Sequence, residues 1–252
     1  GAQGADDEKF IAENLHENVT PHLVKFSQAQ TIVKERFVDS DSLAKLFEVY
    51  YFEEEPQVTD SEEDEVCTWL QQNLSRFDAV IVPDYGNGMI TARMIEVICG
   101  HSPFLAVNTQ VNSGNRGYHV VTRYPRANFI CLNEPELWLA SHNRHDPTDQ
   151  LAQQIMAKLG ADGIAITQGA KGLLAIHKDL SEPHHVPALA SKVVDRVGAG
   201  DAFLALASIC LASGLPPKLA AFVGGAAAAL EVQIIGNRRT VERESLLQYI
   251  SV

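Results

Sequence analysis

One stretch decides the fold of this chain: Val193-Val194-Asp195-Arg196-Val197-Gly198-Ala199-Gly200-Asp201-Ala202-Phe203-Leu204. The two β-branched residues at its start predict a strand that ends at Asp195, and the Ala/Leu/Ile-rich residues 202–213 predict a helix. The glycine run 198–200 between them is typical of a turn that opens a helix. Free N–H groups and the dipole at a helix N-terminus attract negatively charged oxygen atoms. The stretch therefore predicts an anion site.

Asp201 follows the glycine run directly, so we expect it in the first helical turn, where the anion would bind. A base that acts on a hydroxyl next to a phosphoryl group belongs at such a position. The alternative is structural: the glycines allow the helix to pack closely on the strand, and Asp201 caps the helix. The residue types alone leave both interpretations open.

The pattern Asp-x-x-Gly-Ala-Gly-Asp at residues 195–201 resembles the C-terminal signature of the ribokinase-like (PfkB) carbohydrate kinases. That signature is usually Asp-Thr-x-Gly-Ala-Gly-Asp, and an arginine replaces its Thr here. The resemblance implies an α/β, Rossmann-like ribokinase fold with three α/β/α layers, a mostly parallel central sheet and a small β-lid. It also implies that Asp201 is the catalytic base and that the amides of Gly198, Ala199 and Gly200 form the anion hole.

Composition limits the class of protein. At 252 residues and 46% hydrophobic content, the chain can bury one sizeable core. Its formal net charge of −12 argues against nucleic acid or an anionic membrane as a partner. Eight acidic residues lie in the run 53–65, which predicts the start of a surface helix. The widely spaced cysteines predict reduced core residues of a cytoplasmic protein: Cys67, Cys99, Cys131 and Cys210.

The first residues resemble a segment where family members end an early strand. By this resemblance, residues 1–252 form a single ribokinase-like kinase domain that lacks its N-terminal segment. The family's first strand and its Gly-Gly sugar-binding motif are then expected upstream of Gly1. Apolar residues spaced at three to four predict an amphipathic helix over residues 7–18.

Two β-prone runs, 31–38 and 46–52, flank a turn and predict a hairpin. The resemblance implies that residues 24–52 form the β-lid, which closes over the sugar and often supplies a homodimer contact. The alternative is an ordinary edge hairpin. Lys34 would suit binding of a phosphorylated sugar, although a solvated lysine fits the pattern equally well.

The loop Asp84-Tyr85-Gly86-Asn87-Gly88 follows a buried strand at residues 79–83. Ligands of open parallel sheets bind at the carboxyl ends of the strands. The loop resembles the Asp-Tyr-x-Lys-Gly loop of the heptose-phosphate kinase branch, with Asn87 in place of the lysine, and this implies substrate binding by Asp84 and Asn87. The alternative is a turn-rich loop without a function. The amide-rich residues 108–115 either bind sugar hydroxyls or form a solvated loop.

Asn133-Glu134-Pro135-Glu136 follows the predicted strand 128–132 and resembles the family's Asn-x-x-Glu motif. The resemblance implies that Asn133 and Glu136 organise the waters around Mg²⁺, which keeps most of its water ligands in proteins. Thr148 is expected to cap the following helix, which ends at Gly160.

Strand 163–166 leads into Thr167-Gln168-Gly169-Ala170-Lys171-Gly172, which resembles the family's nucleotide loop. This implies that Thr167, Gly169 and Gly172 approach the phosphates of ATP. The helix predicted over residues 218–232 and the following Gly236-Asn237 would flank the adenine. Some members bind a monovalent cation through the first Asp of the signature, here Asp195, so K⁺ stays an option beside Mg²⁺.

The resulting hypothesis is ATP-dependent phosphorylation of a hydroxyl on a small-molecule sugar or sugar phosphate. Two alternatives stay open: a non-catalytic nucleotide- or sugar-binding regulatory module, and a kinase of a vitamin-like alcohol. A Rossmann oxidoreductase is disfavoured because no Gly-x-Gly-x-x-Gly follows an early strand. The chain also lacks the Gly-x-x-x-x-Gly-Lys-Ser/Thr pattern of P-loop kinases.

Overall fold

The computed structural model describes residues 3–28, 31–39, 45–51, 58–111, 117–236 and 238–251. Four predicted features fall partly or wholly outside these ranges. They are Asn237, half of the amide-rich loop, part of the acidic run and parts of the predicted β-lid.

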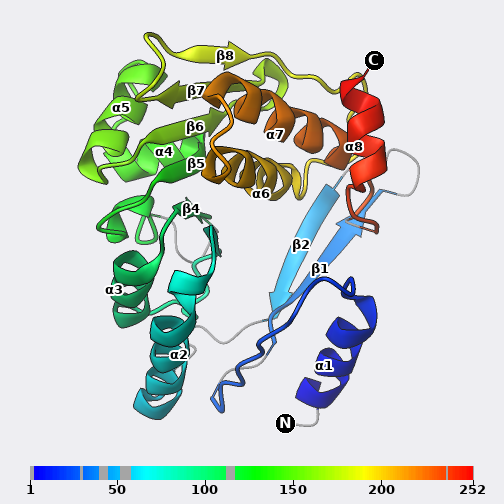
Figure 1. Ribbon diagram of the computed structural model, residues 1–252. Helices are drawn as coiled ribbons and strands as arrows, with labels where there is room; N and C mark the ends of the chain where they lie inside the picture. Colours follow the sequence, from blue (N-terminus) through cyan, green and yellow to red (C-terminus); the bar gives the residue numbers. More distant parts are fainter. Residues whose placement is uncertain are drawn as a thin grey trace.

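A six-stranded sheet forms the centre of the molecule (Figure 1). Its strands, in spatial order, are β3 (Val80–Asp84), β4 (Leu105–Thr109), β5 (Phe129–Asn133), β6 (Gly163–Thr167), β7 (Leu173–His177) and β8 (His184–Val186). Strands β3 to β6 are parallel, while β7 and β8 add antiparallel pairs. The carboxyl ends of four neighbouring strands therefore share one edge, where ligands of such sheets bind.

Helices cover both faces of the sheet and make three layers. One face packs against α3 (Ala92–His101), α4 (Glu134–Ser141) and α5 (Thr148–Lys158). The other packs against α6 (Ala199–Ala212) and α7 (Pro217–Glu231), which cross in front of the sheet in Figure 1. Successive strand residues point to opposite faces, so Ile130 and Leu132 join the first layer while Phe129 and Cys131 join the second. The three-layer, mostly parallel α/β fold is confirmed.

Small side chains bring the second layer close to the sheet. Ala106, Cys131, Ala165 and Ala175 line the strand surface beneath α6 and α7. The two helices approach each other at Gly224, where a Cβ atom would lie 2.8 Å from the ring of Phe203. Phe203 is 1% exposed, so the ring has no free space into which it could move. Core packing thus fixes where α6 begins relative to the strands.

The predicted hairpin forms from β1 (Val33–Val38) and β2 (Lys45–Tyr51), which pair antiparallel as a separate two-stranded sheet. Figure 1 shows this hairpin (blue) beside the main body, next to α1 (Gln3–Asn14). The predicted N-terminal amphipathic helix corresponds to α1, which begins earlier and ends earlier than expected.

Helix α2 (Asp60–Asn73) grows out of the acidic run, as predicted. Thr59 caps it by accepting a hydrogen bond from the Glu62 N–H, and Glu62 accepts from the Thr59 N–H in return. The chain ends with α8 (Arg243–Ile250), and three single-turn 3₁₀ helices lie at Leu74–Arg76, Val121–Arg123 and Gly169–Lys171. Within the described ranges, no helix is long and apolar enough to span a membrane.

Two local predictions are wrong. No strand ends at Asp195, because the N–H groups of Val194 and Asp195 donate instead to the carbonyl of Val232, at 2.8 and 3.0 Å. Those bonds join the segment to the end of α7 and leave it outside the sheet. Thr148 does not cap α5, since Pro147 holds the N-cap position and the Thr148 hydroxyl donates to Glu134 Oε1 at 3.2 Å.

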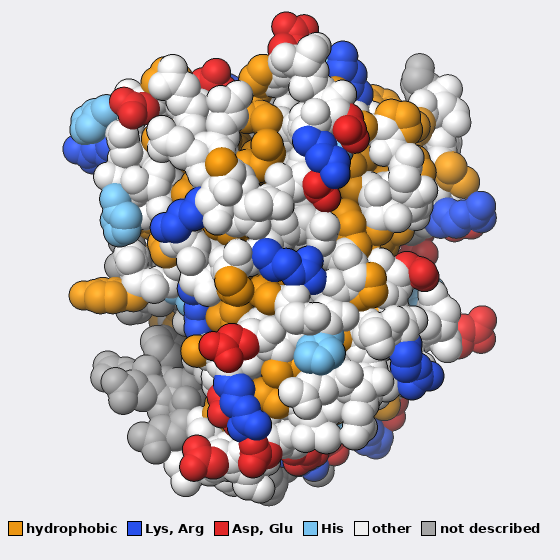
Figure 2. Space-filling view, turned by 60° about the vertical axis from the view of Figure 1, so that its left-hand side comes forward, with side chains coloured by type: hydrophobic (Ala, Val, Ile, Leu, Met, Phe, Trp, Pro, Cys, Tyr) orange, Lys and Arg blue, Asp and Glu red, His pale blue; other side chains and the backbone are white. Residues whose placement is uncertain are grey.

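Charge is mixed over the face drawn in Figure 2. Lys and Arg side chains alternate there with Asp and Glu side chains. Two ion pairs connect α3 to α2, where Arg93 lies beside Glu63 and Asp64. Exposed pairs of this kind add little to stability.

Candidate active site

The glycine turn ahead of α6 has the geometry of an anion site. Gly198 is the N-cap, with a φ of 85° that favours glycine. The first hydrogen bond within the helix runs from the Ala202 N–H to the Gly198 carbonyl at 2.9 Å. The amides of Ala199, Gly200 and Asp201 therefore precede that bond and face the helix end. Because no strand leads into this turn, the helix alone supplies the site.

Neither the backbone conformation of Gly200 nor its protein neighbours require a glycine at this position in the first turn. Its φ is not positive, and a Cβ atom built on it meets no neighbouring heavy atom within 4 Å. Alanine would be the better residue for helix stability alone. The missing side chain leaves open space in front of the helix N-terminus, which has room for a ligand.

Asp201 projects from the same turn and is half-buried. Burial raises the pKa of its carboxyl, while a hydrogen bond from the Tyr85 hydroxyl and the positive charge of Lys34 act in the opposite direction. Burial and the charge of Asp201 raise the pKa of Tyr85 to about 12, so this hydroxyl remains a donor at neutral pH. A carboxylate that is held near the helix end in this way can accept a proton from a nearby alcohol.

Lys34 reaches this carboxylate from the hairpin. Its ammonium group lies 5.2 Å from the centre of the Tyr50 ring and 5.6 Å from the centre of the Tyr85 ring. Both distances are within the range of cation–π attraction. The structure thus brings Lys34 and Asp201, two residues predicted from sequence, to one place, together with two tyrosines that the prediction did not include.

Asp84 is close in sequence to this cluster, but its carboxylate is turned inward and is 3% exposed. It accepts hydrogen bonds from the Tyr124 hydroxyl at 2.8 Å, from Arg123 at 3.3 Å and from the Gly86 N–H at 3.2 Å. His119 Nε2 lies 3.0 Å away. Burial opposes ionisation, but these partners outweigh it and lower the pKa of Asp84. Asp84 holds the loop of residues 84–88 in place, and Asn87 lies on that loop, half-buried.

Asn133 and Glu136 form a capping box at the start of α4. The Asn133 side chain accepts from the Glu136 N–H at 2.8 Å, and Glu136 Oε2 accepts from the Asn133 N–H at 2.9 Å. Burial raises the pKa of Glu136 to about 7, although hydrogen bonds from the Asn133 and Val111 backbone and from the Asn108 side chain oppose the rise. Asn108 also donates to the Cys131 carbonyl at 2.8 Å. Asn108, at the end of β4, thus connects Glu136 to β5, and the sequence analysis did not predict this contact.

This donor set fits a magnesium ion only through water. The Asn133 oxygen and one Glu136 oxygen already accept backbone hydrogen bonds, and a buried carboxyl that is half ionised near pH 7 would favour a nearby cation. Mg²⁺ commonly keeps several water ligands and takes others from phosphates. In the described part of the chain, no group of three or more His, Cys, Asp or Glu side chains is arranged as a metal site.

The predicted nucleotide loop lies at the same edge of the sheet, since Thr167 at the end of β6 is the register partner of Asn133. The Gln168 side chain donates to Glu134 Oε1 at 2.8 Å and so connects this loop to the start of α4. Gly169 has a φ of 59° with open space at its Cβ position. Gly172 is required by the fold itself, because its φ is 95° and a Cβ atom would lie 2.1 Å from the Val186 carbonyl oxygen.

Asp195 connects the glycine turn to the loop after α7. One carboxylate oxygen accepts from the Val197 N–H at 3.0 Å, and the other accepts from the Gly236 N–H at 3.0 Å. Glu231 lies nearby and is 7% exposed. Burial raises its pKa, and the charges of Asp195 and Asp201 raise it further. The two backbone hydrogen bonds leave Asp195 with lone pairs but give no sign of a preference for K⁺.

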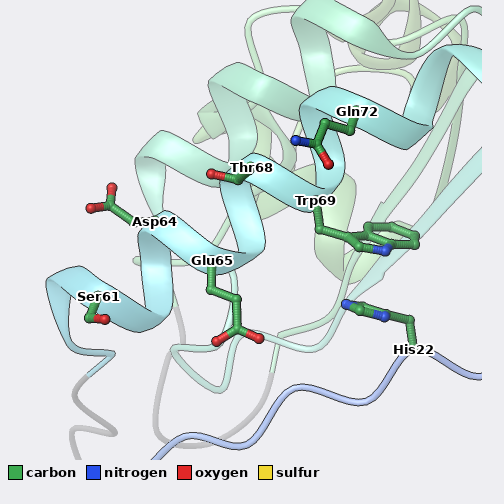
Figure 3. A pocket seen from close by; sticks show the side chains of 7 residues that line it. All are labelled: His22, Ser61, Asp64, Glu65, Thr68, Trp69 and Gln72. Carbon is green, nitrogen blue, oxygen red and sulfur yellow. The ribbon is translucent and has the colours of Figure 1, made fainter.

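A separate hollow of about 430 Å³ lies along α2 and contains none of the predicted site residues (Figure 3). His22 stacks on Trp69 along one side of it, with ring centres 4.4 Å apart and planes 13° apart. The side chains that line it are His22, Ser61, Asp64, Glu65, Thr68, Trp69 and Gln72.

Comparison with known proteins identifies the family and the fold. A profile of the family described as pfkB family carbohydrate kinase matches residues 1–243. The Bifunctional protein HldE of Trichlorobacter lovleyi is 29% identical over 185 residues, which span 72% of this chain and 37% of that relative. The chain therefore spans less than half the length of this relative.

Two solved structures have the same fold. The tetrameric inhibited form of phosphofructokinase-2 from Escherichia coli superposes with a TM-score of 0.79 at 15% identity, covering 100% of this chain and 79% of that chain. Arabidopsis thaliana ribokinase complexed with ribose and ATP gives a TM-score of 0.62 at 18% identity, with coverages of 89% and 70%. The family match over nearly the whole sequence, together with the fold, shows that this chain belongs to the pfkB family of carbohydrate kinases.

Proposed function

We propose that this chain catalyses ATP-dependent phosphorylation of a hydroxyl group on a sugar or sugar phosphate. The observation that carries the proposal is the start of α6. There, Asp201 lies beside amides that precede the first helical bond and beside space that a Cβ atom on Gly200 would fill. Phosphoryl transfer depends mainly on positioning and on charge stabilisation, and this helix end offers both.

In the proposed reaction, Asp201 accepts the proton of the acceptor hydroxyl as its oxygen attacks the γ-phosphorus of ATP. The bond between that phosphorus and the bridging oxygen breaks, and ADP leaves. The amides of Gly198, Ala199 and Gly200 stabilise the negative charge on the transferring group. Mg²⁺ bound to the ATP phosphates would supply further positive charge, with Asn133 and Glu136 holding its water ligands. Hydrogen bonds from Asn108 and the Val111 N–H keep Glu136 in place.

We assign the ATP phosphates to the loop with Thr167 and Gly169 and the adenine to the region of Gly236 and Asn237. The relative solved with ribose and ATP supports ATP as donor. The exchange of Gly172 for a larger residue would disturb this loop through the fold, because its Cβ position is already taken by the Val186 backbone. A K⁺ ion at Asp195 belongs to the proposal only as an addition to Mg²⁺.

We place the acceptor between the hairpin and the loop after β3, under a β-lid formed by residues 24–52. Lys34 gives this space a positive charge, which suits a phosphate or carboxylate on the acceptor. Asn87 offers an amide for a sugar hydroxyl. Asp84 would act there by shaping the loop, since its own carboxylate is buried among protein donors.

We further propose a homodimer through the outer face of the hairpin. Phe37 and Phe47 stack there with ring centres 4.4 Å apart, and they are 39% and 53% exposed. Val33 and Tyr51, on the same face by the strand register, are 53% and 54% exposed. These four exposed apolar side chains surround Glu35, which accepts from the Tyr51 hydroxyl, and together they suit contact with a second copy.

We also propose that the protein is cytoplasmic, because its four cysteines are free thiols.

The test is ATP consumption by the protein with a panel of sugars, sugar phosphates and vitamin-like alcohols. We expect Asp201→Asn to lower turnover roughly 10²–10⁴-fold while ATP still binds. Asp162→Asn is the matched control, since this half-buried carboxylate at the other end of β6 pairs with Lys178 and should leave turnover unchanged. An unchanged rate in Asp201→Asn would remove this residue as the base. ATP binding without turnover on any acceptor would identify a non-catalytic module instead.

A further inference from the structure

Tyr85 is the residue that joins three parts of the candidate site. It follows β3, its hydroxyl donates a hydrogen bond to the Asp201 carboxylate on α6, and its ring lies 5.6 Å from the ammonium group of Lys34 on β1. Tyr85 is 37% exposed, so part of the residue is accessible from outside the protein. No packing requirement of the core explains a tyrosine hydroxyl at this point.

The loop that carries Tyr85 is held from the inside. The neighbouring Asp84 carboxylate accepts from Tyr124, Arg123 and the Gly86 N–H, at distances from 2.8 to 3.3 Å. Arg123 also donates to His119 Nδ1 at 3.0 Å, and His119 Nε2 lies 3.0 Å from an oxygen of Asp84. This buried network fixes the backbone next to Tyr85, so that its hydroxyl is directed toward Asp201.

We propose that Tyr85 is a positioning residue for the base: its hydroxyl orients the Asp201 carboxylate, while Lys34 on the hairpin lies over its ring. The proposal rests on the proposed function of Asp201. A hydrogen bond donated to a carboxylate stabilises the charged form and restricts its rotation. Both effects prepare Asp201 to accept a proton from an alcohol.

Among the described residues, four ionisable groups on neighbouring elements interact with Asp201. Lys34 on β1 and Tyr85 after β3 favour its charged form, against the effect of burial. Burial raises the pKa of Cys131 on β5 and of Glu231 on α7, and the negative charge of Asp201 raises both pKa values further. Without the Tyr85 hydroxyl, Lys34 and the N-terminal end of α6 would still favour the ionised carboxylate, but no described side chain would donate a hydrogen bond to it in place of Tyr85.

The experiment removes one oxygen atom. Tyr85→Phe keeps the ring and its contact with Lys34, and thermal unfolding should match that of the original protein. The carboxyl titration of Asp201, followed by ¹³C NMR and assigned with Asp201→Asn, should show an acid dissociation constant lowered roughly tenfold. The acidic limb of the kcat/KM profile should move to higher pH by the same amount. Tyr118→Phe, at a residue 92% exposed, is the matched control and should change neither measurement.

Each outcome decides the matter. An Asp201 titration that stays in place in Tyr85→Phe overturns the proposal, and so does a change confined to KM, which would make Tyr85 a substrate contact. In the Asp201→Asn background, Tyr85→Phe should cause no further loss of turnover, and an additive loss also overturns it. Full turnover in Asp201→Asn alone would instead overturn the proposed function, while the NMR titration would still report the hydrogen bond.

Discussion

Replacement of Gly200 by alanine should move stability and activity in opposite directions. Gly200 lies in the first turn of α6 without a positive φ, and a Cβ atom there meets no neighbouring heavy atom within 4 Å. Alanine restricts the unfolded chain and favours the helix, which is worth up to about 1 kcal/mol in a helix interior and about half of that in a first turn. We therefore expect the melting temperature of Gly200→Ala to rise by roughly 1–2 °C.

The same methyl group would occupy the space in which we place the transferring phosphoryl group. A ligand held by the amides of this turn would have to shift by about the size of a methyl group, and a misplacement of about 1 Å can cost roughly 10²-fold in rate. We expect turnover to fall by about this factor. The assay is the steady-state rate of ADP release with the best acceptor of the panel, paired with calorimetric unfolding of the same preparation.

Gly224→Ala is the matched control, because it makes the same chemical change on the neighbouring helix. Its Cβ atom would lie 2.8 and 2.9 Å from two ring atoms of the buried Phe203. Overpacking of this kind costs roughly 1–3 kcal/mol, which corresponds to a melting temperature lower by roughly 2–12 °C. Two results would refute the reasoning: full activity in Gly200→Ala, or a loss of stability in Gly200→Ala as large as that in Gly224→Ala.

Two further predictions concern buried carboxylates. Asp84 has a pKa below its ordinary value of 3.8, so it stabilises the fold above that pH and loses this contribution as the pH falls further. Asp84→Asn should lower the free energy of unfolding in urea by roughly 2–4 kcal/mol at pH 7. The difference in this free energy between the original protein and the variant should become smaller below pH 3.8, and a difference that stays constant with pH would contradict the ionic role of Asp84. Glu136→Gln should raise the Mg²⁺ concentration needed for half-maximal turnover roughly tenfold, because the variant would lose the carboxylate that holds water ligands of the metal. Glu62→Gln changes the equivalent capping-box residue of α2 and should leave this requirement unchanged, so equal effects would reduce Glu136 to a helix cap.

The sequence predicted the layers of the fold because they depend on local patterns. Apolar runs such as Ile164 to Ile166 form buried strands, and the alanine-rich residues of α7 form a tightly packed helix. Acidic residues and a Thr-x-x-Glu box mark the start of α2. Each of these signals lies within a few residues of the element that it specifies.

The wrong strand at residues 193–195 shows the limit of such patterns. Two valines predict a strand, yet the partner of this backbone is the carbonyl of Val232 at the end of a helix, almost forty residues further along the chain. Strand β8 shows the reverse case, since two of its three residues are histidines and pairing with β7 alone specifies it. Propensity cannot reveal which distant group satisfies a backbone N–H.

The sequence predicted individual residues of the candidate site but not the contacts between residues that are distant in the chain. Asp201 and Asn133 belong to motifs that stand out in the sequence, and both lie at the expected edge of the structure. Tyr85 belongs to the loop that resembles Asp-Tyr-x-Lys-Gly and Asn108 to the amide-rich stretch, but neither pattern indicated a hydrogen bond to Asp201 or to Glu136. Arg123 belonged to no motif, because its contact with Asp84 depends on folding.

The hairpin β1–β2 shares no ladder of hydrogen bonds with the six-stranded sheet. Changes in its length, or in side chains other than Lys34, therefore leave the pairing of the sheet strands intact. Under the proposed function, a lineage of such enzymes can acquire a new acceptor through mutations elsewhere in the hairpin, while Lys34 keeps its contact with Tyr85. Selection for a different acceptor can in this way act on the hairpin, while selection on the transfer reaction acts on the residues of the main sheet and of α6.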